Sequence, residues 1–307
     1  MTSRATAEPG RTEPDVTGPA APATTSRVPR LVVSDLDGTF LSPDGSVSAL
    51  NREAVRLARE AGIDVLFATG RPVRWLEVIR DLPGAHATVI ASNGAVLYDL
   101  ATGTLLDRLC LQPEATVHAV RAIRAAVPRA GFAFETGSRF GYDPGYQRRR
   151  EESTTPGVVF SAPAEELARS QDCVKMLVQD LTRSPDELLA AVLAVVGDTL
   201  TVTHSAASPY GLVEVSGPGV TKATMLQRWC GRIGIDRADV AAFGDMPNDG
   251  EMLSWAGQPH VVANAHPLLL AQGYPTVPAN SESGVGQAIG RWARVARPGG
   301  LLATPAS

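Results

Sequence analysis

A short apolar run that ends in two carboxylates constrains this chain more than any other feature. Leu31 to Asp35 suits a buried parallel strand that ends in a loop, and Asp37 and Gly38 follow in that loop. Glycine permits a turn there, so both carboxylates can face one cleft. Like charges about 4 Å apart repel by roughly 4 kcal/mol at an effective dielectric near 20. The pair therefore predicts a shared cation, and oxygen-only ligands favour a hard divalent ion such as Mg²⁺.

The alternation of strand and helix signals continues along the chain. Strands are expected at 64–68 and 88–91, each ending in a polar turn, and again at 240–243 and 260–262. A second acidic cluster, 244–249, follows the 240–243 strand. This order predicts an α/β fold, a Rossmann-like parallel sheet built from right-handed strand–helix–strand units. Ligands collect at the carboxyl ends of such strands, so the acidic clusters are expected to converge there.

The middle of the chain has a different pattern. A hairpin is expected at 96–106, and helices at 114–127 and 185–196 mix with several strands. Residues 136–165 lack clear periodicity and are expected to form loops with one weak strand at 158–160. The mixture predicts an α+β unit inserted into the α/β core.

These changes predict the domain organisation. The core is expected at 29–112 and 210–297, with an inserted α+β cap at 113–209. Residues 1–28 are rich in Thr, Pro, Ala and Gly and are expected to be a disordered tail, and 298–307 a flexible one.

Composition excludes several classes of function. The formal net charge is only -4 over 307 residues, and no basic stretch carries interleaved aromatic residues, so no nucleic-acid partner is expected. No apolar run approaches the roughly 18 to 20 residues of a membrane helix, so no membrane association is expected. Cys110, Cys173 and Cys230 are far apart and lack zinc or redox spacing, which favours a reduced, cytoplasmic setting.

Lysine is rare in this chain. Lys175 and Lys222 are its only lysines among 28 basic residues. Lys222 lies in the first turn of a predicted helix, where a lysine is ordinarily a surface residue. Its rarity in this chain favours instead a need for a compact point charge, which the planar fork of arginine does not supply. Lys175 is placed in a cap strand and is expected to be an ordinary solvated residue.

Four segments, in order, resemble the motifs of haloacid dehalogenase superfamily phosphatases of the Cof type. The resemblance runs from about residue 31 to residue 289. It departs from the usual pattern at Phe40, in place of leucine, and at Ala223, in place of glycine. The matching segments are Asp35-Leu36-Asp37-Gly38-Thr39 for DxDGT, Ala68-Thr69-Gly70-Arg71 for ATGR, Lys222 for the third motif and Gly244-Asp245-Met246-Pro247-Asn248-Asp249 for GDxxND.

The resemblance implies catalytic roles for four residues. Asp35 would attack phosphorus as the nucleophile, since a carboxylate needs no deprotonation. Asp37 would protonate the leaving oxygen and later deprotonate water. Thr69 and Lys222 would hold the phosphoryl oxygens where negative charge develops.

The resemblance also implies a Mg²⁺ site. Asp35, Asp245 and the backbone carbonyl of Asp37 would bind the ion, and Asn248 and Asp249 would orient metal-bound water or Lys222. The remaining residues expected beside the site, as supports or substrate contacts, are Gly70, Arg71 and Asn93. For Arg71, substrate contact and an ion pair at the sheet edge are equally expected.

The expected function is that of a Mg²⁺-dependent phosphatase that hydrolyses a small phosphorylated metabolite, such as a sugar phosphate, through an aspartyl-phosphate. Two alternatives stay open. One is a phosphotransferase or phosphomutase with the same chemistry, and the other is a metabolite-binding regulator without turnover. The motifs specify neither the substrate nor the oligomeric state.

Overall fold

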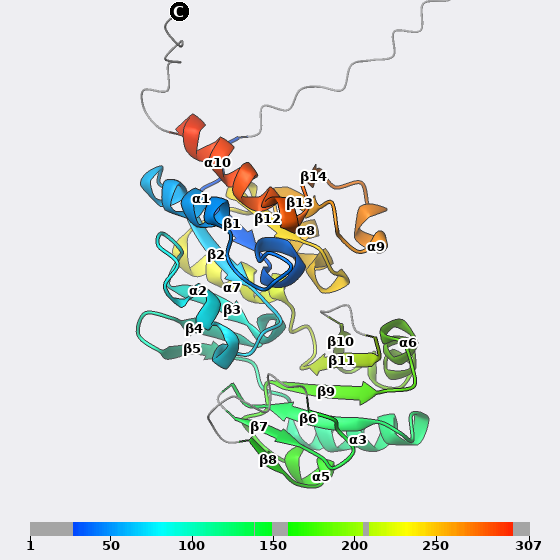
Figure 1. Cartoon of the computed structure of the whole chain (residues 1–307). Coiled ribbons are helices and arrows are strands. Elements are labelled where there is room, and N and C mark those ends of the chain that lie inside the picture. Colours follow the sequence, from blue (N-terminus) through cyan, green and yellow to red (C-terminus); the bar gives the residue numbers. More distant parts are fainter. Residues whose placement is uncertain (1–26, 138, 149–158, 205–208, 297–307) are drawn as a thin grey trace, which may run out of the picture.

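A computed structural model shows two units, each built around one sheet (Figure 1). The larger unit contains both the first and the last described segments, and the smaller unit is formed by the middle of the chain. The residues described are 27–137, 139–148, 159–204 and 209–296.

The larger unit has an eight-stranded sheet in the order β14-β13-β12-β1-β2-β3-β4-β5. The strand β1 is central and pairs in parallel with β12 and β2, whereas β4 and β5 form an antiparallel hairpin at one edge. This arrangement confirms the predicted Rossmann-like core. The strands are β1 (Leu31–Ser34), β2 (Asp64–Ala68), β3 (Thr88–Ala91), β4 (Val96–Asp99), β5 (Thr104–Arg108), β12 (Val240–Gly244), β13 (Gln258–Val262) and β14 (Thr276–Val277).

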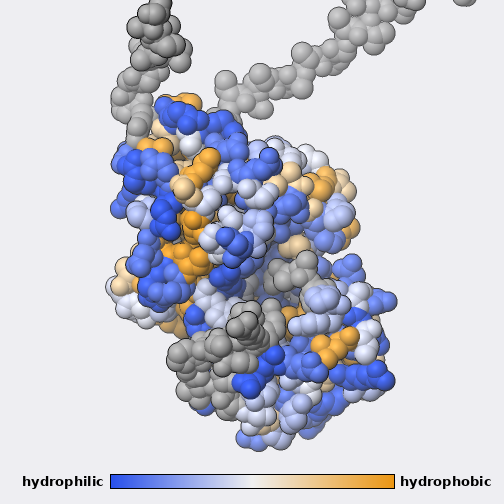
Figure 2. Space-filling view, viewed as in Figure 1, coloured by the Kyte–Doolittle hydropathy of each residue, from blue (hydrophilic) through white to orange (hydrophobic). Residues whose placement is uncertain are grey.

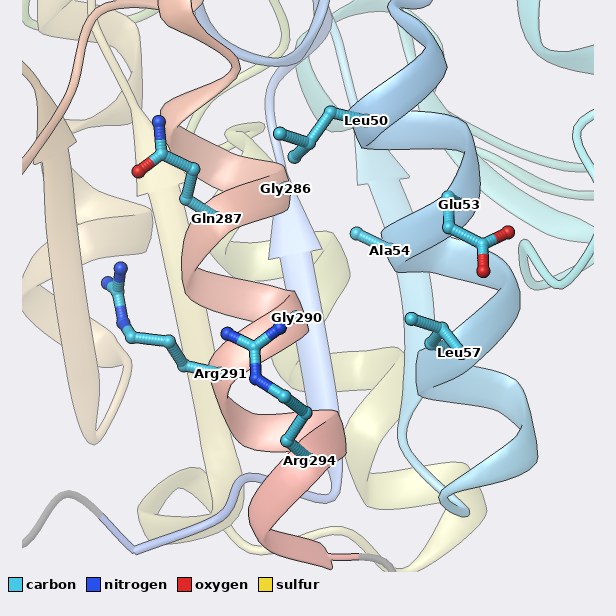
Figure 3. A pocket seen from close by; sticks show the side chains of 9 residues that line it. All are labelled: Leu50, Glu53, Ala54, Leu57, Gly286, Gln287, Gly290, Arg291 and Arg294. Carbon is cyan, nitrogen blue, oxygen red and sulfur yellow. The ribbon is translucent and has the colours of Figure 1, made fainter. Parts of the chain in front are cut away.

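Helices cover this sheet. Ser48 caps the first one by accepting a hydrogen bond from the backbone N–H of Asn51, and a capping box at Thr221 begins α7. The first and last helices pack along each other and leave between them a groove of about 350 Å³, lined in part by Leu50, Leu57 and Gly290 (Figure 3). The helices are α1 (Ala49–Glu60), α2 (Glu77–Arg80), α7 (Lys222–Ile233), α8 (Gly250–Trp255), α9 (Pro267–Leu270) and α10 (Gly284–Ala296).

The smaller unit has a six-stranded sheet in the order β10-β11-β9-β6-β7-β8. Its apolar core lies between this sheet and its helices, among them α3 and α6, which pack against each other. The strands are β6 (Gly131–Glu135), β7 (Phe140–Tyr142), β8 (Val159–Ser161), β9 (Lys175–Asp180), β10 (Thr201–Thr203) and β11 (Gly211–Ser216), and the helices are α3 (Pro113–Ala126), α5 (Ala164–Leu167) and α6 (Pro185–Val196).

The predicted division of the chain needs one adjustment. Residues 211–216 were assigned to the core, but β11 pairs with β9 and β10 in the smaller sheet. The chain returns to the larger unit only after Ser216. An apolar strand pattern does not reveal which sheet the strand joins, because that depends on partners distant in sequence. The predicted tails lie outside the described residues, except for Arg27 and Val28.

No helix of the described residues has both the length and the apolar character to cross a bilayer. Hydrophilic residues predominate over both units on the face shown in Figure 2.

Candidate active site

Three strand ends meet at one edge of the larger sheet. Ser34, the last residue of β1, is in register with Phe67 of β2 and Phe243 of β12. The residues that follow these strands therefore lie side by side at the edge of the sheet. Asp35 and Thr69 are among them. The predicted convergence of polar strand ends is what the fold produces.

Lys222 connects two of the acidic segments. It is the first residue of α7 and its side chain is 1% exposed. Its Nζ donates to Asp35 Oδ1 at 2.5 Å and to Asp249 Oδ1 at 2.7 Å. Asp249 Oδ2 also accepts the backbone N–H groups of Asp245 and Met246. Asp249 therefore fixes both the loop and the lysine.

Burial and the neighbouring charges change the pKa values of these groups. Burial works against the charge of Lys222, but Asp249 and Asp35 outweigh it and raise the pKa of the ammonium. Burial raises the pKa of Asp35 well above its ordinary value, although Lys222 lowers it. Burial, followed by the charge of Asp249, raises the pKa of Asp245 to about 7. Burial is thus the main cause of the raised pKa of both carboxyl groups, and the charge of Asp249 adds to it.

Asp37 lies apart from the other carboxylates. Its side chain is 48% exposed and is held by Arg71, whose Nε donates to Oδ2 at 2.7 Å and whose Nη2 donates to Oδ1 at 2.6 Å. Arg71 therefore forms an ion pair, which is one of the two roles left open for it. The backbone N–H of Arg71 in turn donates to Thr69 Oγ1 at 3.1 Å.

Thr39 and Gly38 shape the position of Asp245. Gly38 was expected only to permit the turn after β1, and Thr39 had no expected role. Thr39 Oγ1 donates to Asp245 Oδ1 at 2.5 Å. Gly38 has φ +80°, and a Cβ there would lie 2.3 Å from Asp245 Oδ2. Only glycine fits both the backbone conformation and this close approach. Asn264 Nδ2 donates to the Gly38 carbonyl oxygen at 2.8 Å, which ties a third loop to the same turn.

The residues present fit a hard divalent cation. One oxygen from each of Asp35, Asp245 and Asp249 lies within 4.8 Å of the others. These three carboxylates face one ammonium, that of Lys222, which leaves two negative charges uncompensated. An all-oxygen donor set with this charge suits Mg²⁺. Asp35 and Asp245 are the better donors, because Asp249 is already engaged by Lys222 and two backbone N–H groups.

A further polar layer adjoins the site. Asn93 has φ +55° in the turn after β3, and its backbone N–H donates to the Thr69 carbonyl oxygen at 3.0 Å. Asn248 Nδ2 donates to Asn93 Oδ1 at 3.1 Å, whereas the buried Asn248 Oδ1 has no hydrogen-bond partner among the described residues. Asn248 therefore contacts Asn93 rather than Lys222.

The expectation that Lys175 is solvated was wrong. Lys175 is 2% exposed, and its Nζ donates to the Gly70 carbonyl oxygen at 2.8 Å and to Glu214 Oε1 at 2.5 Å. Its burial depends on partners in both units, which no local pattern reveals. The rarity of lysine in this chain was the one available signal.

The chain is similar to several known proteins. The sequence pattern of the haloacid dehalogenase-like hydrolases matches residues 32–289. The HMP-PP phosphatase of Cronobacter sakazakii is 27% identical to this chain, over 79% of this chain and 87% of its own. A haloacid dehalogenase-like hydrolase of B. subtilis shares the fold with a TM-score of 0.73 at 24% identity, covering 85% of this chain and 98% of its own. A protein of Streptococcus mutans also has a TM-score of 0.73, at 22% identity, covering 86% and 98%.

Proposed function

The chain belongs to the haloacid dehalogenase-like hydrolase family and is a phosphatase, and on that premise we propose that it hydrolyses a small phosphomonoester with Mg²⁺ through an aspartyl-phosphate on Asp35. The observation that carries the proposal is the buried Lys222 ammonium between Asp35 and Asp249. A buried cation that fixes one carboxylate oxygen beside other acidic strand ends suits a nucleophile that attacks an anionic phosphoryl group.

In the first half-reaction, Asp35 Oδ2 forms a bond to phosphorus while the bond from phosphorus to the ester oxygen breaks. Lys222 holds Asp35 Oδ1 at 2.5 Å, so the carboxylate is oriented before substrate arrives. The departing oxygen takes a proton from Asp37. Thr69 Oγ1 and Lys222 Nζ donate hydrogen bonds to the phosphoryl oxygens, as expected from the family motifs.

In the second half-reaction, Asp37 accepts a proton from a water molecule, whose oxygen attacks phosphorus. The bond between phosphorus and Asp35 Oδ2 breaks and inorganic phosphate leaves. Arg71 holds both oxygens of Asp37. It thereby keeps this carboxylate on the side of the cleft where the leaving group and then water are placed.

The proposed metal donors are the carboxylates of Asp35 and Asp245 with the backbone carbonyl of Asp37. The chemistry that Mg²⁺ supplies when bound is neutralisation of the charge on the phosphoryl oxygens. Thr39 orients Asp245 through its 2.5 Å hydrogen bond, and Asp249 positions Lys222. Asn93 and Asn248 support the adjoining loop.

The proposed substrate is a small phosphorylated metabolite, such as a sugar phosphate. One relative is named for HMP-PP, which supports a small phosphorylated molecule as the class. The smaller unit acts as the cap, over the carboxyl ends of the core strands, and excludes water from the first half-reaction. A cytoplasmic setting remains part of the proposal, because Cys110, Cys173 and Cys230 are all free thiols.

The test is turnover of p-nitrophenyl phosphate with Mg²⁺, followed by a panel of phosphorylated metabolites. Asp35→Asn should abolish turnover while the melting temperature stays near that of the wild type, and chelation should abolish it reversibly. Mass spectrometry of the quenched wild-type enzyme should detect phosphate on the peptide that contains Asp35. Retained turnover in Asp35→Asn would refute the nucleophile.

The same assay separates the alternatives. A phosphotransferase or phosphomutase would require an acceptor before phosphate leaves the donor. A regulator would bind phosphorylated metabolites with Mg²⁺ and release no phosphate.

Asp44→Asn is the matched control for Asp35→Asn. Asp44 is an acid of the exposed loop before α1, and in the described contacts it bonds only to Ser46.

A further inference from the structure

A buried ion pair lies in the cap sheet at its boundary with the core. Lys175 is the first residue of β9, and Glu214 lies on the neighbouring strand β11. The two side chains are joined at 2.5 Å between Nζ and Oε1, and the residues are 2% and 7% exposed. Such a pair costs free energy to desolvate unless further hydrogen bonds satisfy it.

The core supplies these further bonds, and they come from the catalytic loops. Lys175 Nζ donates to the carbonyl oxygen of Gly70 at 2.8 Å. Gly70 lies between Thr69, a proposed phosphoryl donor, and Arg71, which holds Asp37. Lys175, one member of the cap ion pair, is therefore hydrogen-bonded to the loop that follows β2.

The other end of the ion pair reaches the loop that follows β12. Glu214 Oε2 accepts a hydrogen bond from Asn93 Nδ2 at 2.6 Å. Asn93 Oδ1 accepts one from Asn248 Nδ2 at 3.1 Å, and Asn248 is next to Asp249, the partner of Lys222. A continuous hydrogen-bonded path thus joins the cap to both loops.

We propose that Lys175 and Glu214 are positioning residues whose ion pair couples the seating of the cap to the arrangement of the two catalytic loops. The inference rests on the proposed phosphatase function. Gly70 and Asn93 each supply a hydrogen bond to this pair, so a seated cap favours one arrangement of Thr69, Arg71 and the 245–249 loop. Neither side chain needs to touch the substrate.

The direct test is Glu214→Gln, which keeps the size of the side chain and removes its charge. Its kcat for p-nitrophenyl phosphate should fall at least about tenfold, with KM changed less than about threefold, because misplaced loops weaken the transition state more than substrate binding. The inhibition constant for orthovanadate, a mimic of the pentacoordinate phosphorus, should rise in parallel.

A matched control separates this coupling from cap closure alone. Glu135 is also a buried cap carboxylate, and it pairs with Arg74 of the core, with 2.6 Å between Oε1 and Nη2. The hydrogen bonds described between these two side chains do not involve Gly70, Asn93 or Asn248. Glu135→Gln should change kcat less than about threefold. An equal loss of kcat in Glu135→Gln and Glu214→Gln would overturn the proposal.

A second variant guards against misfolding. Lys175→Met with Glu214→Gln leaves neither member of this pair charged, so the cap should fold, yet kcat should remain at least about tenfold below that of the wild type. Wild-type kcat in this double variant would overturn the proposal.

Hydrogen exchange provides a readout that does not depend on turnover. The backbone amides of 69–71, 92–94, 245–246 and 248–249 should exchange faster in Glu214→Gln than in Glu135→Gln. Equal protection of these amides in both variants would overturn the coupling. Absence of turnover by the wild type on every phosphomonoester would refute the proposed function, and the exchange experiment would still decide the coupling.

Discussion

Arg71 holds the carboxylate of Asp37 with two parallel hydrogen bonds, of 2.7 Å from Nε to Oδ2 and 2.6 Å from Nη2 to Oδ1. Arg71 itself is held by its Nη1, which donates to the carbonyl oxygen of Trp75 at 3.1 Å. Burial opposes its charge, but the hydrogen bonds and charge of Asp37 raise the pKa of the guanidinium. Asp37 is thus fixed in a single orientation although it is half exposed.

The first prediction concerns this pair. Arg71→Ala should lower kcat about tenfold to hundredfold, because Asp37 would then sample orientations that cannot reach the leaving oxygen. Arg71→Lys should recover only part of the loss, since an ammonium cannot form the two parallel bonds. Steady-state kinetics with p-nitrophenyl phosphate and saturating Mg²⁺ measure the effect. Arg80→Ala, which removes an exposed partner of Glu77, is the control; similar kcat values for Arg71→Ala and Arg80→Ala would contradict the prediction.

The second prediction concerns the buried ammonium of Lys222. Lys222→Met should lower the free energy of unfolding by about 3–5 kcal/mol, because it leaves Asp35 and Asp249 buried without their cation. Added Mg²⁺ should restore part of this stability, whereas turnover should stay lost. Denaturant titrations with and without Mg²⁺ give both quantities. Arg56→Met, which removes an exposed cation of α1, should leave stability unchanged.

The sequence was sufficient to predict the polar strand ends because their signals are local. A buried apolar run followed by acids, at Asp35 and Asp245, identifies the carboxyl end of a parallel strand wherever the strand lies. The parallel order of the strands then brings the ends together. Lys222 could be placed because it stands at the position of the third family motif and is one of only two lysines in the chain.

The rest could not be predicted because it depends on contacts between distant segments. Lys175 is buried by Gly70, which is 105 positions away, and Glu214, which is 39 positions away. The same limit led to the assignment of β11 to the wrong sheet. For Arg71, two roles were equally expected, since its choice of partner depends on where the Asp37 side chain points.

The third prediction concerns two glycines of α10, seen in Figure 3. A Cβ at Gly286 would lie 2.3 Å from Asn51 Oδ1 and 2.7 Å from Leu50 Cδ2. Asn51 accepts from the Gly286 N–H at 2.9 Å and donates to the Phe40 carbonyl oxygen at 2.5 Å. Gly286→Ala should therefore destabilise the protein by about 1–3 kcal/mol, because the helices must separate.

Gly290 provides the matched control. A Cβ there meets only Arg294 Nη1, at an ordinary 3.7 Å. Gly290→Ala should stabilise the protein by about 0.5–1 kcal/mol, because alanine loses less backbone entropy in a helix. Thermal unfolding of both variants tests these two expectations. A melting temperature that shifts in the same direction in both variants would show that the α1–α10 contact does not depend on Gly286.

The fourth prediction concerns the pH dependence of stability. His260 packs against Phe243 and Trp292, with ring centroids 5.0 and 5.5 Å away. Burial lowers its pKa below the ordinary 6.5, and Arg291 adds to this, although the Gln258 carbonyl opposes it. The unfolded chain therefore binds more protons, so the stability that neutral His260 contributes is present above about pH 6.5 and is lost as pH falls toward the depressed pKa of the folded state. The free energy of unfolding should fall less steeply between pH 7 and pH 5 in His260→Phe than in the wild type, as measured by denaturant titration at each pH. An equal slope in both proteins would show that His260 is protonated as readily in the folded state as in the unfolded chain.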